Sequence, residues 1–486
     1  MLLPTHYAKH ELTSRYTCSI SRIQWLCFTA LLTCSLYAYN LLRRSNALIT
    51  AETPQPESTL YTLDPHTLPP TYHAYHQAEL QLPQHDWSRR RPAPHQKFFF
   101  VAGHVRGLGW GNALQEHLLN AHLAYVSNRT FVFSNYTWND DGSTYSDYNG
   151  KLIPSQIPYT VLIRGPAVGD PLPLAFHIPP AVSKEYFDHV CPRKFELDQH
   201  EVNAHITHPS SALEVTEKWS AALQATSEAC LQSSMASQQI YSHYRIFGIR
   251  GALADLWPTL SVSPVLTYFG WSSLIERALD VNQRLFYYPS LAGANLTGTP
   301  YTSNAERYTP IPGLMAIHVR RGDYLKHCVD LTDQGEDFVS INTLPGLADP
   351  FVAPRGFFFN ELTRADRDLY RRRCFPSVAE IAQKVEEVRA TIEGRGIRRI
   401  YIMTNGKPDF ISELKEALLT AGTWDAIHSS RDMILDKEEK YVAQAVDMLV
   451  AQRAQVFIGN GFSTLTSGAV MMRLANGFPV NSTRFW

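Results

Sequence analysis

The feature that most constrains the fold of this chain is a strand, a glycine-rich loop and a helix that follow one another from residue 98. Residues 98–105 (FFFVAGHV) form an apolar run typical of a buried strand, and RGLGWGN follows them. Apolar residues at positions 114, 118, 121 and 125 then repeat with helical spacing, and a second strand is expected at 130–133. Such a strand–loop–helix–strand unit is typical of parallel α/β folds.

The glycines of this loop have two explanations. They allow backbone N–H groups and the helix N-terminus to face an anion, or they serve a tight turn that requires positive φ. A dinucleotide-binding fingerprint would need a third glycine where the chain has Asn112, and an acidic residue where it has Ser134. We therefore do not expect NAD to bind.

A second apolar run, residues 314–319, ends in charged residues. Alternation along a strand places His318 and Arg320 on one side of it. Parallel sheets present ligand-binding groups at the carboxyl ends of their strands, and a guanidinium suits diphosphate oxygens. We expect Arg320 to stabilise a departing diphosphate. A structural pair between Arg321 and Asp323 is the alternative.

The C-terminal third alternates helices and strands. A short strand is expected at 456–458, and a helix is expected to begin at Ser463 and Thr464, where its N-terminus forms a second anion site. A simple helix cap is the alternative. The other expected elements are a helix with a capping box at Ser377 and an apolar stripe at positions 381, 385, 388 and 392, a strand at 397–404, and helices at 410–418 and 441–453.

The first hundred residues differ from the rest. Residues 23–42 form a run of 20 residues without a formal charge, long enough to span a bilayer, and a buried core helix is the alternative. Flanking arginines weakly favour a cytoplasmic tail at 1–22 and a globular head, after the span and its stem, on the lumenal side. Residues 43–96 are rich in proline and have little periodicity, so we expect an extended stem without helix.

Four cysteines lie in the expected head, at Cys191, Cys230, Cys328 and Cys374. Their spacing is too wide for a zinc site, and an oxidising lumen would allow two disulfides. Three pairings are possible, of which we favour Cys191–Cys230 with Cys328–Cys374. Glycosylation sequons occur at Asn128, Asn135, Asn295 and Asn481.

Several function classes are disfavoured. Lys and Arg number 44 and Asp and Glu 45, a net charge of -1 that does not fit an electrostatic nucleic-acid binder. The chain contains no P-loop and no His-Glu-x-x-His motif. Residues 366–368 read Asp-Arg-Asp, but they lie in a charged helical run, so we expect a solvated face and no metal site.

Three groups of residues together resemble the GDP-fucose fucosyltransferase superfamily, the protein O-fucosyltransferases most of all. GLGWGN with Asn128-Arg129-Thr130 resembles the family's Gly-x-Phe-Gly-Asn loop and strand entry. Residues 318–323 (HVRRGD) resemble its His-x-Arg element. Asp447, FIGN at 457–460 and STLT at 463–466 resemble its C-terminal nucleotide loop. The resemblance spans residues 98–472.

The resemblance implies an α/β fold of the GT-B type, in which two Rossmann-like domains, here 97–310 on the acceptor side and 311–486 on the GDP-sugar side, face a cleft. It implies that Arg320 is catalytic and binds the β-phosphate. The substrate-binding residues it implies are Gly111, Asn112, His318, Arg321, Asp447, Ser463, Thr464 and Leu465, the last at a position where relatives often carry an aromatic residue.

The implied reaction is an inverting, metal-independent transfer of fucose from GDP-fucose to a protein or glycan hydroxyl. The glycine loop lacks the glutamate base of some relatives, so the base is unassigned, with Glu116 and Asp323 as candidates. The expected location is the Golgi or endoplasmic reticulum membrane, as a single-pass type II protein. The alternative function is that of a membrane-anchored nucleotide-sugar or glycan-binding protein with weak catalysis.

Overall fold

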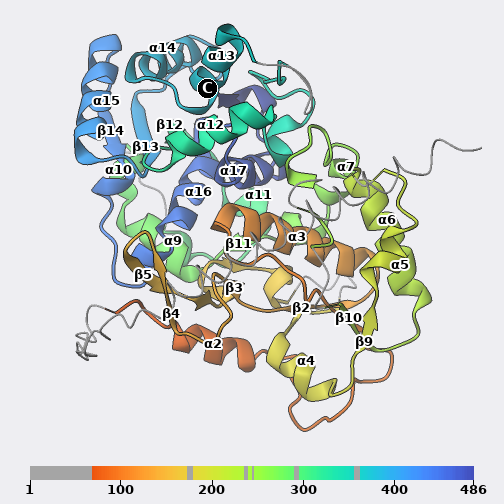
Figure 1. Cartoon of the computed structure of the whole chain (residues 1–486). Helices are drawn as coiled ribbons and strands as arrows, with labels where there is room; N and C mark the ends of the chain where they lie inside the picture. The colour runs from red at the N-terminus through yellow and green to blue at the C-terminus, as the bar shows by residue number, and fades with distance from the viewer. Residues whose placement is uncertain are drawn as a thin grey trace, which may run out of the picture. The chain divides into compact units, whose positions relative to one another are not determined.

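Two five-stranded parallel sheets organise the protein, for which we have a computed structural model (Figure 1). The structure describes residues 68–171, 179–208, 210–234, 239–242, 246–288, 295–354 and 362–486. The expected tail at 1–22, the anchor at 23–42 and most of the stem lie outside these residues. Among the helices that the structure describes, none has the length and apolar character needed to cross a membrane.

The first sheet contains the predicted strand and glycine loop. Its strand order is β8 (Val182–Ser183), β2 (Thr130–Phe133), β1 (Phe98–Phe100), β10 (Cys230–Ser233) and β9 (Phe195–Leu197), all parallel. Helix α3 (Trp110–Val126) connects β1 to β2 and lies between this sheet and the C-terminal helices (Figure 1). The predicted strand–loop–helix–strand unit is therefore confirmed.

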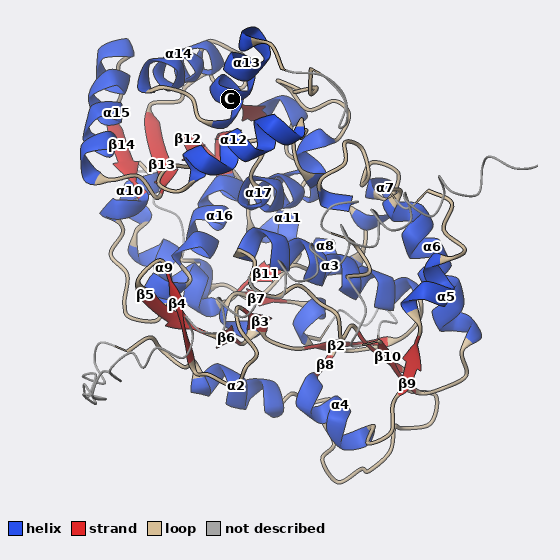
Figure 2. Cartoon of the chain, in the orientation of Figure 1, coloured by secondary structure: helices blue, strands red, loops and turns tan. Residues whose placement is uncertain are grey.

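The second sheet carries at its centre the strand that Arg320 directly follows, called the arginine strand below. Its order is β14 (Ala426–Ser429), β13 (Arg399–Thr404), β12 (Ile311–Val319), β15 (Ala454–Gly459) and β16 (Thr483–Phe485). Met315, Ile317 and Val319 pack against helices α14 (Val378–Arg389) and α15 (Pro408–Ala421). The opposite face packs against α16 (Ala443–Arg453) and α17 (Thr464–Ala475), so helices cover both faces, as Figure 2 shows. A mixed α/β fold with parallel sheets is confirmed.

Shorter elements surround the two sheets. The strands are β3 (Tyr136–Thr137), β4 (Tyr145–Tyr148), β5 (Lys151–Pro154), β6 (Gln156–Ile157), β7 (Ile163–Arg164) and β11 (Gly270–Trp271). The helices are α4 (Lys184–Val190), α5 (Gln199–Asn203), α6 (Ala212–Ala225), α7 (Trp257–Leu260), α8 (Pro264–Thr267), α9 (Ser273–Val281), α10 (Gln283–Phe286), α11 (Asn304–Arg307), α12 (Tyr324–Gln334) and α13 (Arg364–Cys374).

Predictions about the C-terminal helices are mostly confirmed. Ser377 and Glu380 form the expected capping box of α14, and the positions 381, 385 and 388 are buried. Ile392 is wrong as a member of this stripe, because α14 ends at Arg389 and Ile392 is 73% exposed beyond it. The favoured disulfides are confirmed as Cys191–Cys230 and Cys328–Cys374.

The expectation of a stem without helix is wrong at its C-terminal end. Helix α2 (His73–Leu80) begins after Tyr72, which is buried and donates a hydrogen bond to the carbonyl of Glu438. Glu79 is also buried and accepts hydrogen bonds from the backbone and hydroxyl of Thr160. No proline interrupts residues 71–82, so tertiary contacts stabilise a helix there that periodicity alone does not predict.

Candidate active site

The N-termini of α3 and α17 meet at Gly111. A Cβ atom on Gly111 would lie 2.5 Å from the backbone N of Leu465 and 2.5 Å from the carbonyl carbon of Thr464. No side chain fits there unless the backbone moves. Because the backbone at Gly111 touches that of Thr464 and Leu465, the two predicted anion sites lie side by side.

Both helix N-termini have features suited to an anion. The first-turn N–H groups of a helix have no intrahelical partners and lie at the positive end of its dipole. Ser463 is the N-cap of α17, but its side chain makes no capping hydrogen bond. In the first turn of α3, the buried Oδ1 of Asn112 has no partner among the described residues. Leu465 is half-buried against the core.

His318 connects the arginine strand to α17. Its Nδ1 lies 2.8 Å from Oγ1 of Thr466, and its carbonyl accepts a hydrogen bond of 2.9 Å from the indole of Trp486. Burial, with a smaller effect of Arg320, lowers the pKa of His318 to about 3, so the ring is neutral near pH 7. Thr466 belongs to the STLT motif at 463–466, and its sequence context alone predicts no role for it.

Arg320 lies on the same side of the chain as His318. Its side chain is 33% exposed, and its guanidinium lies 3.6 Å from Asp323 and 5.7 Å from the centre of the Tyr324 ring. The Tyr324 hydroxyl donates to the carbonyl of Phe462, which directly precedes Ser463. An ion pair of 3.6 Å is too long for a hydrogen bond, so the guanidinium donors are available to an anion beside α17.

Arg321 points to the other side of the strand. Its guanidinium lies 4.2 Å from the Phe375 ring and 4.4 Å from the Phe410 ring, and it donates to the carbonyl of Pro376. This buried setting favours a structural role over the predicted contact with substrate. The contact of Arg321 with substrate stays a prediction. The alternative, a pair between Arg321 and Asp323, is wrong, because Asp323 pairs with Arg320.

Asp447 projects from α16 toward β13. It accepts hydrogen bonds of 2.7 Å from the Tyr401 hydroxyl and of 3.1 Å from the Ser430 hydroxyl. Burial raises the pKa of Asp447 to about 7, although both hydroxyls oppose this shift. The structure thus holds Asp447 by side-chain partners, and its contact with a nucleoside stays a prediction.

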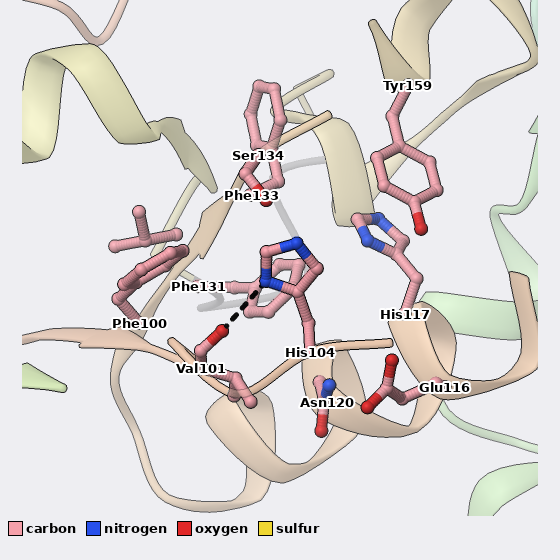
Figure 3. A pocket seen from close by; sticks show the side chains of 11 residues that line it. Phe100, Val101, His104, Glu116, His117, Asn120, Phe131, Phe133, Ser134 and Tyr159 are labelled. Atoms are coloured by element: carbon pink, nitrogen blue, oxygen red, sulfur yellow. Dashed lines mark hydrogen bonds between the residues drawn. The ribbon is translucent and has the colours of Figure 1, made fainter. Parts of the chain in front are cut away.

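The candidate base Glu116 faces a small cavity between α3 and the first sheet (Figure 3). Its Oε2 accepts a hydrogen bond of 2.6 Å from the backbone N–H of Val105, whereas its Oε1 is buried without a partner among the described residues. Burial raises the pKa of Glu116 to about 8, so the carboxyl is largely protonated near pH 7. His104 enters the same cavity and donates from Nδ1 to the carbonyl of Val101.

The acidic residues of α13 lie as predicted. Thr363 and Asp366 form the capping box at the start of the helix, and Asp368 pairs with Arg371 at 3.1 Å on the solvated face. Within the described ranges, no group of three His, Cys, Asp or Glu side chains has an arrangement that could hold a metal ion.

Two residues that hold the α3–α17 junction were missed by sequence reasoning. The buried Gln115 donates hydrogen bonds to the carbonyls of Gly111 and Thr464. Asn342 donates to the carbonyls of Gly461 and Ser463. Apart from Gly111, these partners are main-chain atoms distant in sequence. Such contacts leave no local pattern.

Comparison with known proteins gives a family match for the C-terminal part. Residues 274–474 match the family model described as GDP-fucose protein O-fucosyltransferase. This segment includes His318, Arg320, Asp447 and Ser463 but not the glycine loop. No curated protein sequence matches the chain.

Among solved structures, POFUT1 in complex with GDP-fucose is 17% identical, with 78% of this chain and 95% of that chain covered and a TM-score of 0.45. A POFUT1 complex with GDP is 16% identical, with 81% and 99% covered and a TM-score of 0.46. A mutant of Arabidopsis thaliana FUT1 in complex with GDP is 11% identical, with 82% and 73% covered and a TM-score of 0.33.

Proposed function

We propose that the chain transfers fucose from GDP-fucose to a hydroxyl of a protein or glycan. Through residues 274–474 it belongs to the GDP-fucose protein O-fucosyltransferase family, and it is therefore a glycosyltransferase. The observation that carries this proposal is the position of Arg320. It lies at the carboxyl end of β12, beside Tyr324, whose hydroxyl bonds the loop that leads into α17.

Arg320 is the catalytic residue of this proposal. Bond cleavage leaves negative charge on the β-phosphate of GDP, and a positioned cation stabilises charge that develops in a transition state. The N-termini of α17 and α3 add N–H donors and the positive ends of two helix dipoles. Ser463, Thr464 and Asn112 would then bind the diphosphate, with His318 behind them and Asp447 toward the nucleoside.

We further propose that the reaction inverts the anomeric carbon and requires no metal ion. Arg320 and the helix N-termini supply the positive charge that a metal supplies in other sugar-nucleotide transferases. An acceptor hydroxyl would attack opposite the departing diphosphate, from the side of the first sheet, so that 97–310 and 311–486 act as the two facing domains of a GT-B fold.

The proposed location is the lumen of the Golgi or endoplasmic reticulum, with residues 23–42 as a single-pass anchor. The two disulfides support an oxidising compartment. In intact vesicles, a lumenal head would be protected from added protease until detergent is present. Cleavage of the C-terminus without detergent would refute this topology.

The donor and the role of Arg320 can be tested with the full chain purified in detergent. We expect GDP-fucose, and no other sugar nucleotide of a panel, to give transfer or slow hydrolysis, and GDP to raise thermal stability. Arg320→Ala should lower kcat by about 10²–10³-fold, the loss typical for a donor to a developing charge. Arg367→Ala, which removes an exposed ion pair with Asp333, is the matched control. Unchanged turnover in Arg320→Ala would refute the catalytic assignment.

A further inference from the structure

We propose that Gln115 is a positioning residue that sets the distance between the N-termini of α3 and α17 and thereby shapes the diphosphate site. This inference rests on the proposed function, because it assigns a role to a side chain behind the proposed donor site. Gln115 itself is buried with no exposed surface, so it acts through the backbone of its neighbours.

The carboxamide of Gln115 links the first turns of the two helices. Its Nε2 donates to the carbonyl of Gly111 at 2.7 Å and to the carbonyl of Thr464 at 3.0 Å. These carbonyls belong to the residues whose backbones touch at the Gly111 contact. One amide nitrogen therefore holds together the two chain segments whose N–H groups would face the diphosphate.

The oxygen of the same carboxamide accepts hydrogen bonds as well. Its Oε1 accepts hydrogen bonds from the hydroxyls of Ser340 at 2.8 Å and of Ser467 at 2.7 Å. The amide has a single possible orientation, with its nitrogen toward the two carbonyls and its oxygen toward the two hydroxyls, because carbonyls cannot donate. All four hydrogen-bonding positions of the carboxamide are used, which fixes the side chain in place.

Ser340 is held in an unusual backbone conformation at this junction. Its φ of 52° lies in the left-handed region, which a non-glycine residue adopts at a cost. The turn it begins, Ser340–Thr343, also contributes Asn342, whose amide donates to the carbonyls of Gly461 and Ser463. The turn thus supports both the Gln115 carboxamide and the loop before α17.

Gln115→Glu is the sharpest test, because it keeps the shape of the side chain but removes both N–H donors. A carboxylate there would face the carbonyls of Gly111 and Thr464 and would separate the two helix N-termini. We expect the Kd for GDP, measured by calorimetry on the full chain in detergent, to rise at least tenfold. The KM for GDP-fucose should rise in parallel while kcat changes less than threefold, since Arg320 stays at the carboxyl end of β12.

Gln452→Glu provides a matched control. Gln452 is equally buried on α16, accepts a hydrogen bond from the indole of Trp271 and donates to Asn304, and it makes no bond to the α3–α17 junction. We expect it to lower the melting temperature comparably but to leave the Kd for GDP unchanged. If both variants weaken GDP binding equally, the effect is general destabilisation and the inference is wrong.

Ser340→Ala keeps the inference testable if Gln115→Glu does not fold. It removes one hydrogen bond to Oε1 and should weaken GDP binding threefold or more in a folded chain. GDP affinity equal to wild type in a folded Gln115→Glu, or in Ser340→Ala where Gln115→Glu does not fold, would overturn the inference. A wild-type chain that binds no GDP would instead refute the proposed function, so the two failures are distinguishable.

Discussion

Nδ1 of His318 and Oγ1 of Thr466 lie 2.8 Å apart and join the end of the arginine strand to the first turn of α17. The same hydroxyl oxygen accepts a hydrogen bond of 3.1 Å from the backbone N–H of Asn460. One threonine therefore sets the position of the strand that carries Arg320, the loop before α17 and the helix itself relative to one another.

Thr466→Val tests this link. The substitution preserves side-chain shape but leaves His318 and the Asn460 N–H buried without a partner, at a cost of about 1–3 kcal/mol for each group. We expect a free energy of unfolding lower by about 2–4 kcal/mol and weaker GDP binding, measured by urea denaturation and calorimetry. Thr332→Val removes a hydroxyl whose one hydrogen bond among the described residues goes to the Cys328 carbonyl of its own helix. It should cost less than about 1.5 kcal/mol.

Gly111→Ala should be strongly destabilising. Its Cβ would lie 2.5 Å from backbone atoms of Thr464 and Leu465, which cannot move aside as a flexible side chain can. We expect a loss of about 3 kcal/mol or more, together with weaker GDP binding. Gly109→Ala is the control, because its φ is -61° and a Cβ there meets no atom within 4 Å. Equal melting temperatures for the two variants would contradict the close approach.

The buried carboxyl of Glu116 should make the free energy of unfolding decrease as pH rises. The carboxyl ionises near 4.5 in the unfolded chain, whereas burial raises its pKa to about 8 in the folded one. Between these values the folded state holds a proton that the unfolded state has released, so the free energy of unfolding decreases with pH. Glu116→Gln should flatten this slope between about pH 5 and about pH 8 in urea denaturation.

Glu380→Gln is the control for that slope. Hydrogen bonds with Arg371 lower the pKa of Glu380 to about 2, so its titration lies below the pH window of the measurement. The slope between about pH 5 and about pH 8 should therefore match wild type. A Glu116→Gln variant with the wild-type slope would show that Glu116 is ionised in the folded protein.

The two disulfides should differ in their effect on the donor site. They close loops with sequence separations of 39 and 46 residues, so the chain-entropy model assigns each about 4 kcal/mol. Of the two described disulfides, Cys328–Cys374 is bonded to the loop before α17, because the Cys374 carbonyl accepts a hydrogen bond of 2.7 Å from the amide of Asn460. Replacing this pair by serines should raise the Kd for GDP. Replacing Cys191 and Cys230 should lower stability similarly and leave GDP binding unchanged.

Local patterns were enough to predict the elements that carry the site. The apolar run into Arg320, the glycines before α3 and the hydroxyls before α17 each appear within a dozen residues of sequence. Strand alternation also placed His318 and Arg320 together. The same rule puts Arg321 on the opposite side, and the resemblance alone had assigned it to the substrate.

What sequence reasoning missed depends on contacts between distant residues. Gln115 bonds Thr464 and Ser467, which lie 349 and 352 residues away. Helix α2 was missed because packing of Tyr72 and Glu79 stabilises it, whereas its own periodicity is weak. Such elements become visible only when the partner surfaces are known.

The position of α2 also decides where a fragment of this enzyme that is meant to fold must start. Tyr72 bonds the carbonyl of Glu438, and Glu79 bonds Thr160, so this short helix contacts both the first and the last third of the sequence. A fragment cloned from residue 97 would leave those partners without their hydrogen bonds and expose the core that Tyr72 covers. Fragments for crystallisation or activity assays should therefore begin no later than residue 69.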